Sequence, residues 1–193
     1  MPIRLKYLKY LLSIVAVVLF TVLGTGSNAA SNDTGAVEPN LHTIRKLLIT
    51  ALDSKKTTDS LYTSLGTVKN RSSLLNAYMG ALEACKAKHA WNPYYKIKYL
   101  NDSEKTLQAA VVNDPHNIEI RFMRFSIEHN VPKFLGYTKN LVVDREEMIR
   151  QINNKHYASA DTTLVKTIIN FLLDSKRCTP AEQTSLKQHL AAL

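Results

Sequence analysis

The sequence predicts an all-α fold, and three observations support this prediction. Apolar residues recur at three- and four-residue spacing along most of the chain, as they do on one face of an amphipathic helix. Only 6 glycines and 6 prolines interrupt 193 residues, which favours long helices. The sequence contains no convincing run of alternating apolar and polar residues of the kind that marks a strand. We expect a single helical domain over residues 41–193, long enough to bury a hydrophobic core.

The first 29 residues have the layout of a secretory signal peptide. Three basic residues and no acid occur in residues 1–10, and an apolar run follows from Leu11 to Leu23. Ser27 and Ala29 are small residues suitably placed before a cleavage site. We predict cleavage after Ala29, export to the periplasm or beyond, and no stable membrane span in the mature protein. The alternative is an uncleaved N-terminal membrane anchor, although the run is shorter than the roughly 20 apolar residues of a span.

Residues 30–40 are small and polar and predict a flexible linker. The helices expected after it cover residues 41–52, 58–66, 73–90, 93–113, 117–129, 140–156, 161–175 and 179–193.

Local signals mark where several of these helices begin. We expect N-caps at Thr58 or Asp59, at Ser72 or Ser73, and at Asn92, Asn117 and Thr179, with Glu182 completing a capping box.

Two interior features qualify this assignment. Residues 101–103 (Asn-Asp-Ser) are expected to kink or divide the fourth helix. Gly80 lies in the middle of the third helix, where glycine costs roughly 1 kcal/mol relative to alanine, and so predicts a close approach by a neighbouring helix.

The helix after Asn117 is apolar around most of its circumference, which predicts a central position in the core.

The charge of the chain argues against a nucleic-acid-binding protein. The net charge is +9, and it falls to +6 when the three basic residues of the leader are removed. The remaining basic residues are spread along the chain without a run of like charges, whereas nucleic-acid-binding proteins usually cluster them on one face. We therefore expect a mixed, solvated surface and no nucleic-acid partner.

The chain contains two cysteines, Cys85 and Cys178. In an exported protein a disulfide between them is one option, because exported thiols can oxidise. The other option is two buried thiols, since the sequence does not supply the Cα separation that the bond requires.

Part of the chain resembles the tetratricopeptide repeat, over about residues 76–125. Tyr78-Met79-Gly80 is similar to the signature of the first repeat helix, and Leu107, with Ala109-Ala110 and Asp114-Pro115, is similar to the second helix and its closing proline. Gly80 and Pro115 lie 35 residues apart, about eleven more than in the repeat, and no second copy follows. The resemblance implies an irregular arrangement of antiparallel helical hairpins, whose surface grooves usually bind proteins or peptides.

Two blocks also resemble a class of exported helical proteins to which no activity is attached. These blocks are Asp-Pro-His-Asn-Ile-Glu-Ile-Arg-Phe, at 114–122, and Asn-Val-Pro-Lys-Phe-Leu-Gly-Tyr, at 130–137.

Two groups of side chains are candidate binding residues. Arg121 and Arg124 would anchor an anion in a groove. Alternatively, they would pair with Glu119, Glu128 or loop carbonyls and so fix neighbouring helices. Arg124 and Glu128 lie four residues apart, a spacing that suits an ion pair on a helix. Trp91 and Tyr95, with Tyr94 and Tyr99, would form a platform for a ligand, or else belong to the core with the adjacent lysines pointing outward.

Signatures of catalysis and of metal binding are absent from the sequence. The six histidines are scattered, and no zinc-ligand spacing, phosphate-binding loop or nucleophile motif occurs. We therefore expect no enzyme activity, no cofactor and no metal. The sequence predicts an exported helical scaffold or protein-interaction module with a protein or peptide partner; the alternative is an envelope protein that binds a small anionic ligand.

Overall fold

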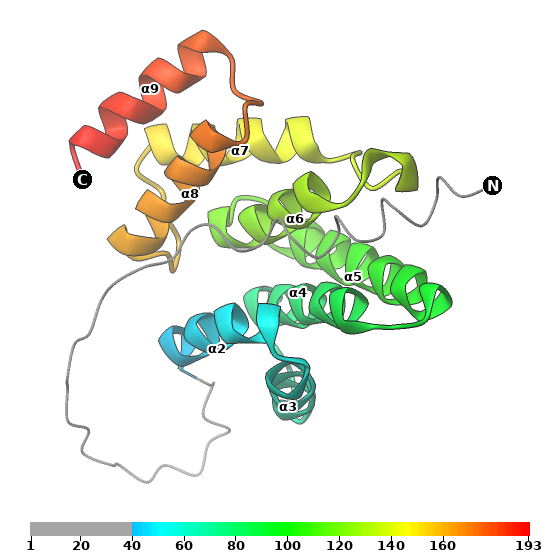
Figure 1. Cartoon of the computed structure of the whole chain (residues 1–193). Helices are drawn as coiled ribbons and strands as arrows, with labels where there is room; N and C mark the ends of the chain where they lie inside the picture. Colours follow the sequence, from blue (N-terminus) through cyan, green and yellow to red (C-terminus); the bar gives the residue numbers. More distant parts are fainter. Residues whose placement is uncertain (1–39) are drawn as a thin grey trace, which may run out of the picture.

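The computed structural model describes residues 40–193, and all regular structure in this range is helical, which confirms the predicted all-α class (Figure 1). The predicted signal peptide and residues 30–39 of the predicted linker lie outside the described residues. The elements are α2 (Leu41–Asp53), α3 (Lys55–Gly66), α4 (Ser73–His89), α5 (Pro93–Asn113), α6 (Ile118–Asn130), the 3₁₀ helix η1 (Lys133–Leu135), α7 (Leu141–Asn153), α8 (Thr162–Asp174) and α9 (Pro180–Ala191).

Helix α6 lies between two hydrophobic cores, as its all-round apolar sequence predicted. Ile120 and Met123 pack into the first core, which is formed with α2, α3, α4 and α5. Ile118 and Phe125 pack into the second core, which is formed with α7, α8 and α9. Figure 1 shows α6 between these two groups of helices. Both cores therefore depend on this one helix for part of their apolar surface.

Helices α4 and α5 run in opposite directions and pack closely along their length. Gly80 makes this approach possible, because a Cβ atom at this position would lie 2.8 Å from Cγ of Leu107 and 3.3 Å from its backbone nitrogen. Leu107 is itself fully buried. The predicted close approach at Gly80 is confirmed, and its neighbour is α5.

Most of the predicted helix starts are confirmed by side-chain capping. The side chains of Ser72, Asn92 and Asn117 accept hydrogen bonds from backbone N–H groups at the starts of α4, α5 and α6. Thr179 and Glu182 form the predicted capping box at the start of α9. These interactions are local in sequence, which is why the sequence alone could identify them.

Other boundaries differ from the prediction. Helix α3 begins at Lys55, because Ser54 rather than Thr58 or Asp59 caps it. Helix α5 continues without a break through residues 101–103, where Ser103 is buried between Leu100 and Leu107 on the packed face. Helix α7 ends at Asn153, three residues before the predicted end. The short η1 helix was not predicted, and it ends at Gly136 in the left-handed region, with φ of 81°.

We predict that Gly80→Ala lowers the free energy of unfolding by about 1–2 kcal/mol. Overpacking against Leu107 costs roughly 1–3 kcal/mol, and the better helix propensity of alanine offsets up to roughly 1 kcal/mol of it. Urea denaturation followed by circular dichroism measures the change. Gly66→Ala is the matched control, because nothing lies within 4 Å of its Cβ position. Equal stability of the two variants would contradict the close approach.

Candidate functional site

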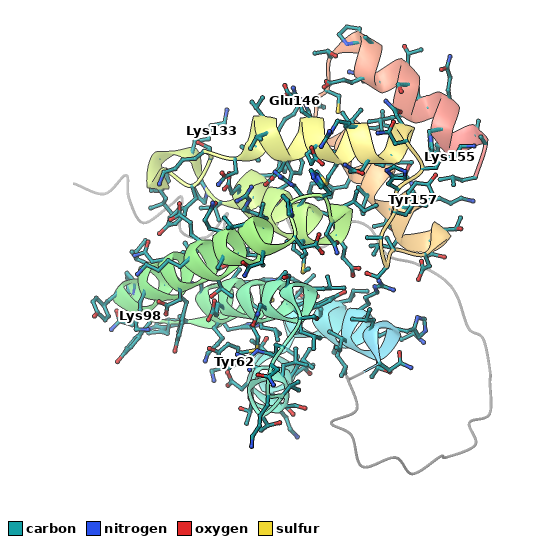
Figure 2. The ribbon with its side chains drawn as sticks, turned by 180° about the vertical axis from the view of Figure 1, so that it is seen from behind. Tyr62, Lys98, Lys133, Glu146, Lys155 and Tyr157 are labelled. Atoms are coloured by element: carbon teal, nitrogen blue, oxygen red, sulfur yellow. The ribbon has the colours of Figure 1, made fainter. Side chains whose placement is uncertain are left out.

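An open groove with a volume of about 500 Å³ lies where α3, the end of α4 and the start of α5 meet. The connection between α4 and α5 forms its rim, with Trp91 and Asn92. Figure 2 shows Tyr62, on α3, and Lys98, on α5, on the same side of the molecule. The volume is within the range of sites that bind small molecules or short peptide segments.

Aromatic side chains line the groove along α5. Trp91 is 96% exposed at the rim, and Tyr95 is 48% exposed on the first turn of the helix. The rings of Tyr95 and Tyr99 stack, with centroids 6.2 Å apart, and Tyr94 meets Tyr95 edge to face at 5.5 Å. The rings of Tyr94, Tyr95 and Tyr99 are called the aromatic wall below. Asn92 fixes the start of this wall, because its side chain accepts a hydrogen bond from the backbone N–H of Tyr94 at 2.8 Å.

The exposure of these aromatics corrects one interpretation of the sequence. Placement in the core, with the lysines pointing outward, is wrong for Trp91, Tyr94 and Tyr95, all of which are exposed. Tyr99 alone is partly buried, against a small cluster that includes Leu100. Within residues 40–193, no helix packs over the groove side of α5 near its N-terminus. The aromatic residues there continue the helical spacing of the buried face, although this part of the helix is exposed.

Lys86 supplies a positive charge beside the aromatic wall. Its ammonium group lies 4.1 Å from the ring centroid of Tyr62 and 5.1 Å from that of Tyr99, where the ring faces attract a cation. Among residues 40–193, no carboxylate forms an ion pair with Lys86, whereas Lys55, across the groove, pairs with Asp59 at 2.5 Å. The sequence did not single out Lys86, because its contact with Tyr62 spans two helices.

The base of the groove is held by hydrogen bonds to carbonyl groups that helix ends leave free. The Thr58 hydroxyl and Nε2 of His89 each donate to the carbonyl of Ala51, in the last turn of α2, at 2.8 Å. Nζ of Lys96 donates to the carbonyls of Ala87 and Lys88 at 3.3 and 3.2 Å, at the end of α4. Burial lowers the pKa of Lys96. These bonds fix α2, α3, α4 and α5 relative to one another around the groove.

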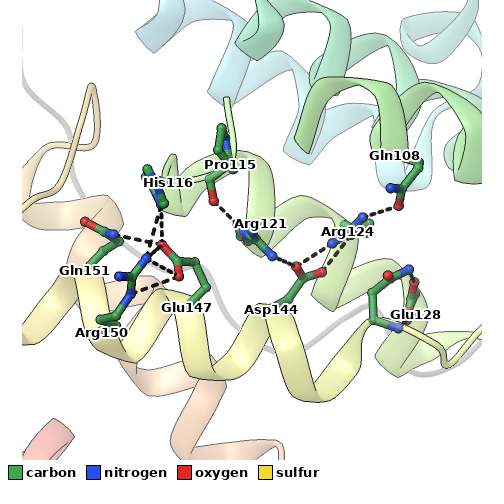
Figure 3. Close-up of polar contacts among 11 residues, drawn as sticks. Gln108, Pro115, His116, Arg121, Arg124, Glu128, Asp144, Glu147, Arg150 and Gln151 are labelled. Atoms are coloured by element: carbon green, nitrogen blue, oxygen red, sulfur yellow. Dashed lines mark hydrogen bonds and ion pairs between the residues drawn. The ribbon is translucent and has the colours of Figure 1, made fainter. Parts of the chain in front are cut away.

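Arg121 and Arg124 lie elsewhere, in a buried ion cluster with Asp144 (Figure 3). Asp144 of α7 is 0% exposed. Its carboxylate accepts one hydrogen bond from Arg121, at 2.7 Å, and two from Arg124, at 2.7 and 2.8 Å. Arg121 also donates to the carbonyl of Pro115, and Arg124 to the side chain of Gln108. The guanidinium groups therefore join α5, α6 and α7.

The predicted ion pair between Arg124 and Glu128 does not form in the structure. Glu128 instead accepts hydrogen bonds from the backbone N–H of Asn140, at 2.9 Å, and from its side-chain amide, at 2.6 Å. Asn140 precedes α7 and makes no capping bond of its own. The sequence showed that these charges need partners, but Asp144 and Asn140 are too far along the chain to be recognised by helical spacing.

Glu119, in the first turn of α6, forms a second buried cluster. Its carboxylate accepts hydrogen bonds from Nε and Nη2 of Arg45 at 2.8 and 2.7 Å, and from the hydroxyl of Tyr78. Arg45 also donates to the carbonyl of Ser159, at 3.0 Å. The hydrogen bonds that Arg45 donates to Glu119 raise the pKa of Arg45, and burial raises the pKa of Tyr78. This cluster ties α2 and α4 to α6 and to the connection before α8.

A third, partly exposed cluster joins the turn before α6 to α7. The carboxylate of Glu147 accepts hydrogen bonds from Arg150 and Gln151 and contacts Nδ1 of His116 at 2.8 Å (Figure 3). Burial raises the pKa of Glu147, but these hydrogen bonds outweigh it and hold the pKa at about 2. Each polar group has a partner within the protein, so the arrangement is that of a clamp between two elements.

The structure thus divides the predicted binding residues into two sets. It places Trp91 and Tyr95 on the groove, and Arg121 and Arg124 in the buried ion cluster. In the described range, no group of three or more histidine, cysteine, aspartate and glutamate side chains is placed to hold a metal ion. None of the helices in residues 40–193 has the length and apolar character needed to cross a membrane.

Cys85 and Cys178 are free thiols, and both are buried. Cys85 lies in α4, whereas Cys178 belongs to the second core, after α8. Burial raises the pKa of Cys85 to about 12 and also raises the pKa of Cys178. Both side chains are thus held as protonated, apolar-like groups.

Neither a family model, nor a curated protein, nor a solved structure matches this chain. The resemblance to the tetratricopeptide repeat over residues 76–125 therefore stays an interpretation of the sequence. The function has to be inferred from the groove and from the clusters themselves.

We predict that Asp144→Asn lowers the free energy of unfolding by about 3–5 kcal/mol. The substitution keeps the shape of the side chain but leaves two buried guanidinium groups without their counter-charge. Chemical denaturation measures the effect. Asp174→Asn is the control, since Asp174 is exposed at the end of α8 and its loss should change stability little. Similar values for the two variants would rule out the central role of Asp144.

We also predict that both thiols remain reduced in the folded protein. N-ethylmaleimide should label neither cysteine rapidly in the native protein near neutral pH, because both are buried and protonated. After unfolding without a reducing agent, mass spectrometry should find both cysteines labelled. An unfolded, unreduced chain that takes up no label would instead demonstrate a disulfide.

Proposed function

We propose that this protein is an exported, helical protein-interaction module, and that the groove between α3, α4 and α5 is its recognition surface. The observation that carries the proposal is the exposure of Trp91 at the rim of the groove, beside Tyr95. Tryptophan and tyrosine are the residues that most often dominate binding energy in protein interfaces. A fully exposed tryptophan next to an open groove is therefore best explained by a partner that covers it.

The shape and the rigidity of the groove favour a macromolecular partner. Sites for small molecules usually enclose most of the surface of their ligand, whereas this groove is open and its largest side chain stands at the rim. The hydrogen bonds of Thr58, His89 and Lys96 hold its base in place before any partner binds. A surface arranged in advance avoids part of the entropic cost of association.

The alternative function, binding of a small anionic ligand, has less support. It relied on Arg121 and Arg124 as an anion anchor, but their guanidinium groups are buried and bonded to Asp144. Within the groove, Lys86 is left as the cation without a carboxylate partner among the described residues. One lysine offers a small anion a single ion pair, and a small anion would leave the exposed rings of Trp91 and Tyr95 uncovered.

Export is proposed from the sequence of the leader, with its basic residues, apolar run and small residues before the site after Ala29. The compartment is consistent with a module that meets its partners outside the cytoplasm. N-terminal sequencing of the exported protein tests this part of the proposal, and an intact Met1 would contradict cleavage.

Site-specific photo-cross-linking tests the recognition surface. A benzophenone amino acid placed at Tyr94, which is exposed beside the groove, should give a discrete cross-linked product in cells. The same probe at Lys166, which is exposed on α8, is the positional control. Trp91→Ala should reduce the product by at least tenfold, because the loss of an interface hot spot costs about 2 kcal/mol or more.

Phe134→Ala is the matched side-chain control, since Phe134 is also an exposed aromatic residue but does not line the groove. It should leave the yield of cross-linked product unchanged. A product that forms equally from Lys166, or that persists in Trp91→Ala, would overturn the groove as the recognition surface.

A further inference from the structure

We infer that the groove binds an extended, acidic peptide segment of its partner, with a carboxylate of the segment paired to Lys86 and apolar side chains against Trp91 and Tyr95. This inference rests on the proposed function and adds the chemical class of the ligand. It follows from the charge balance of the groove and from the spacing of its aromatic rings.

The charge balance leaves one cation of the groove available to the partner. Lys55 is neutralised by Asp59, at 2.5 Å, and Lys98, which also lies over the ring of Tyr99, is neutralised by Asp102 at 2.7 Å. In the part of the chain that the structure describes, Lys86 forms no such ion pair and lies over the rings of Tyr62 and Tyr99. Glu83, one turn earlier on α4, interacts with the charge of Lys86 only at longer range, and its carboxylate accepts a hydrogen bond from the hydroxyl of Tyr62. Ring faces stabilise an ammonium group without neutralising it. An incoming carboxylate can therefore form the ion pair that this lysine lacks.

The surroundings of Lys86 make that ion pair stronger than one on an open surface. The lysine is partly buried between α3 and α5, where the rings of Tyr62 and Tyr99 exclude water on two sides. Electrostatic attraction is stronger where the effective dielectric constant is lower. The carboxylate should therefore contribute to specificity as well as to the rate of association.

The spacing of the aromatic wall fits an extended chain. The ring centroids of Tyr95 and Tyr99 are 6.2 Å apart. An extended segment rises about 3.3 Å per residue, so alternate side chains on one face lie about 6.6 Å apart. A segment lying along α5 can thus place an apolar side chain on Tyr95 and the next side chain of the same face, the carboxylate, beside Tyr99, where Lys86 lies.

Trp91 provides a direct signal for the test, because it is the only tryptophan in the chain and stands at the rim of the groove. Two pools of capped heptapeptides, Xaa-Leu-Xaa-Leu-Xaa-Glu-Xaa and the same pattern with Gln in place of Glu, are titrated into the full-length protein. Xaa is an equal mixture of Ala, Ser and Thr. We expect a saturable change in tryptophan fluorescence with the Glu pool and about tenfold weaker binding of the Gln pool.

Variants of the lysine assign the preference to its charge. Lys86→Gln should abolish the preference for Glu over Gln, and Lys86→Arg should retain most of it. Lys166→Gln, on the exposed side of α8, should behave like the wild type. Circular dichroism of each variant verifies that the helical fold is kept.

Four outcomes would overturn the inference. Equal binding of the two pools, or a preference that survives in Lys86→Gln, would exclude the ion pair. The absence of a saturable signal with both pools would exclude an extended acidic segment. Succinate that saturates the signal and displaces the Glu pool completely would favour a small anion. In each case the cross-linking from Tyr94 decides the proposed function separately, because it does not depend on the chemistry of the partner.

Discussion

The buried carboxylate of Asp144 is the interaction on which the rest of this structure depends. It neutralises Arg121 and Arg124, two charges that α6 carries into the interior of the protein. Without it the helix could not be both strongly charged and central, because an unpaired buried charge costs several kcal/mol. The Glu119 cluster does the same for the first turn of α6, through Arg45 and Tyr78. The position of α6 between two cores is thus set by electrostatic pairing as much as by apolar contact.

The groove depends on this arrangement indirectly. Helix α4 packs on α6 and, through Gly80, closely on α5, so the end of α4 and the start of α5 have little freedom to move apart. The aromatic residues at the start of α5 lie beyond the packed part of the helix. Their exposure is unfavourable for the stability of the fold, and the packing of the rest of α5 offsets it. A rigid core beneath an exposed aromatic surface is the arrangement that favours selective binding, since little order has to be gained on association.

Local chemistry accounts for the features that the sequence predicted well. The helices, the caps at Ser72, Asn92 and Asn117, and the close approach at Gly80 depend on residues within a few positions of each other or on a single unusual residue. The central position of α6 followed from its apolar circumference alone. These signals are physical requirements of a helix end or a helix face, so they do not depend on the rest of the fold.

The features that the sequence could not predict depend on contacts between distant segments. Helical spacing suggested Glu128 as the partner of Arg124, but the tertiary structure supplies Asp144. The same spacing suggested that Trp91 and Tyr95 are buried, because it cannot tell where a covering helix ends. No sequence pattern singled out Lys86, since its importance depends on which of the neighbouring charges are already paired in the folded protein.

The sharing of α6 also bears on how the protein gains and loses its structure. Ile120 and Met123 complete one core while Ile118 and Phe125 complete the other, so neither group of helices can bury its apolar face when α6 is displaced. Loss of order on one side therefore removes support from the other, and the two sides are thermodynamically coupled. A displacement of α6 caused by a change among α2, α3, α4 and α5 would in this way also disturb the packing of α7, α8 and α9.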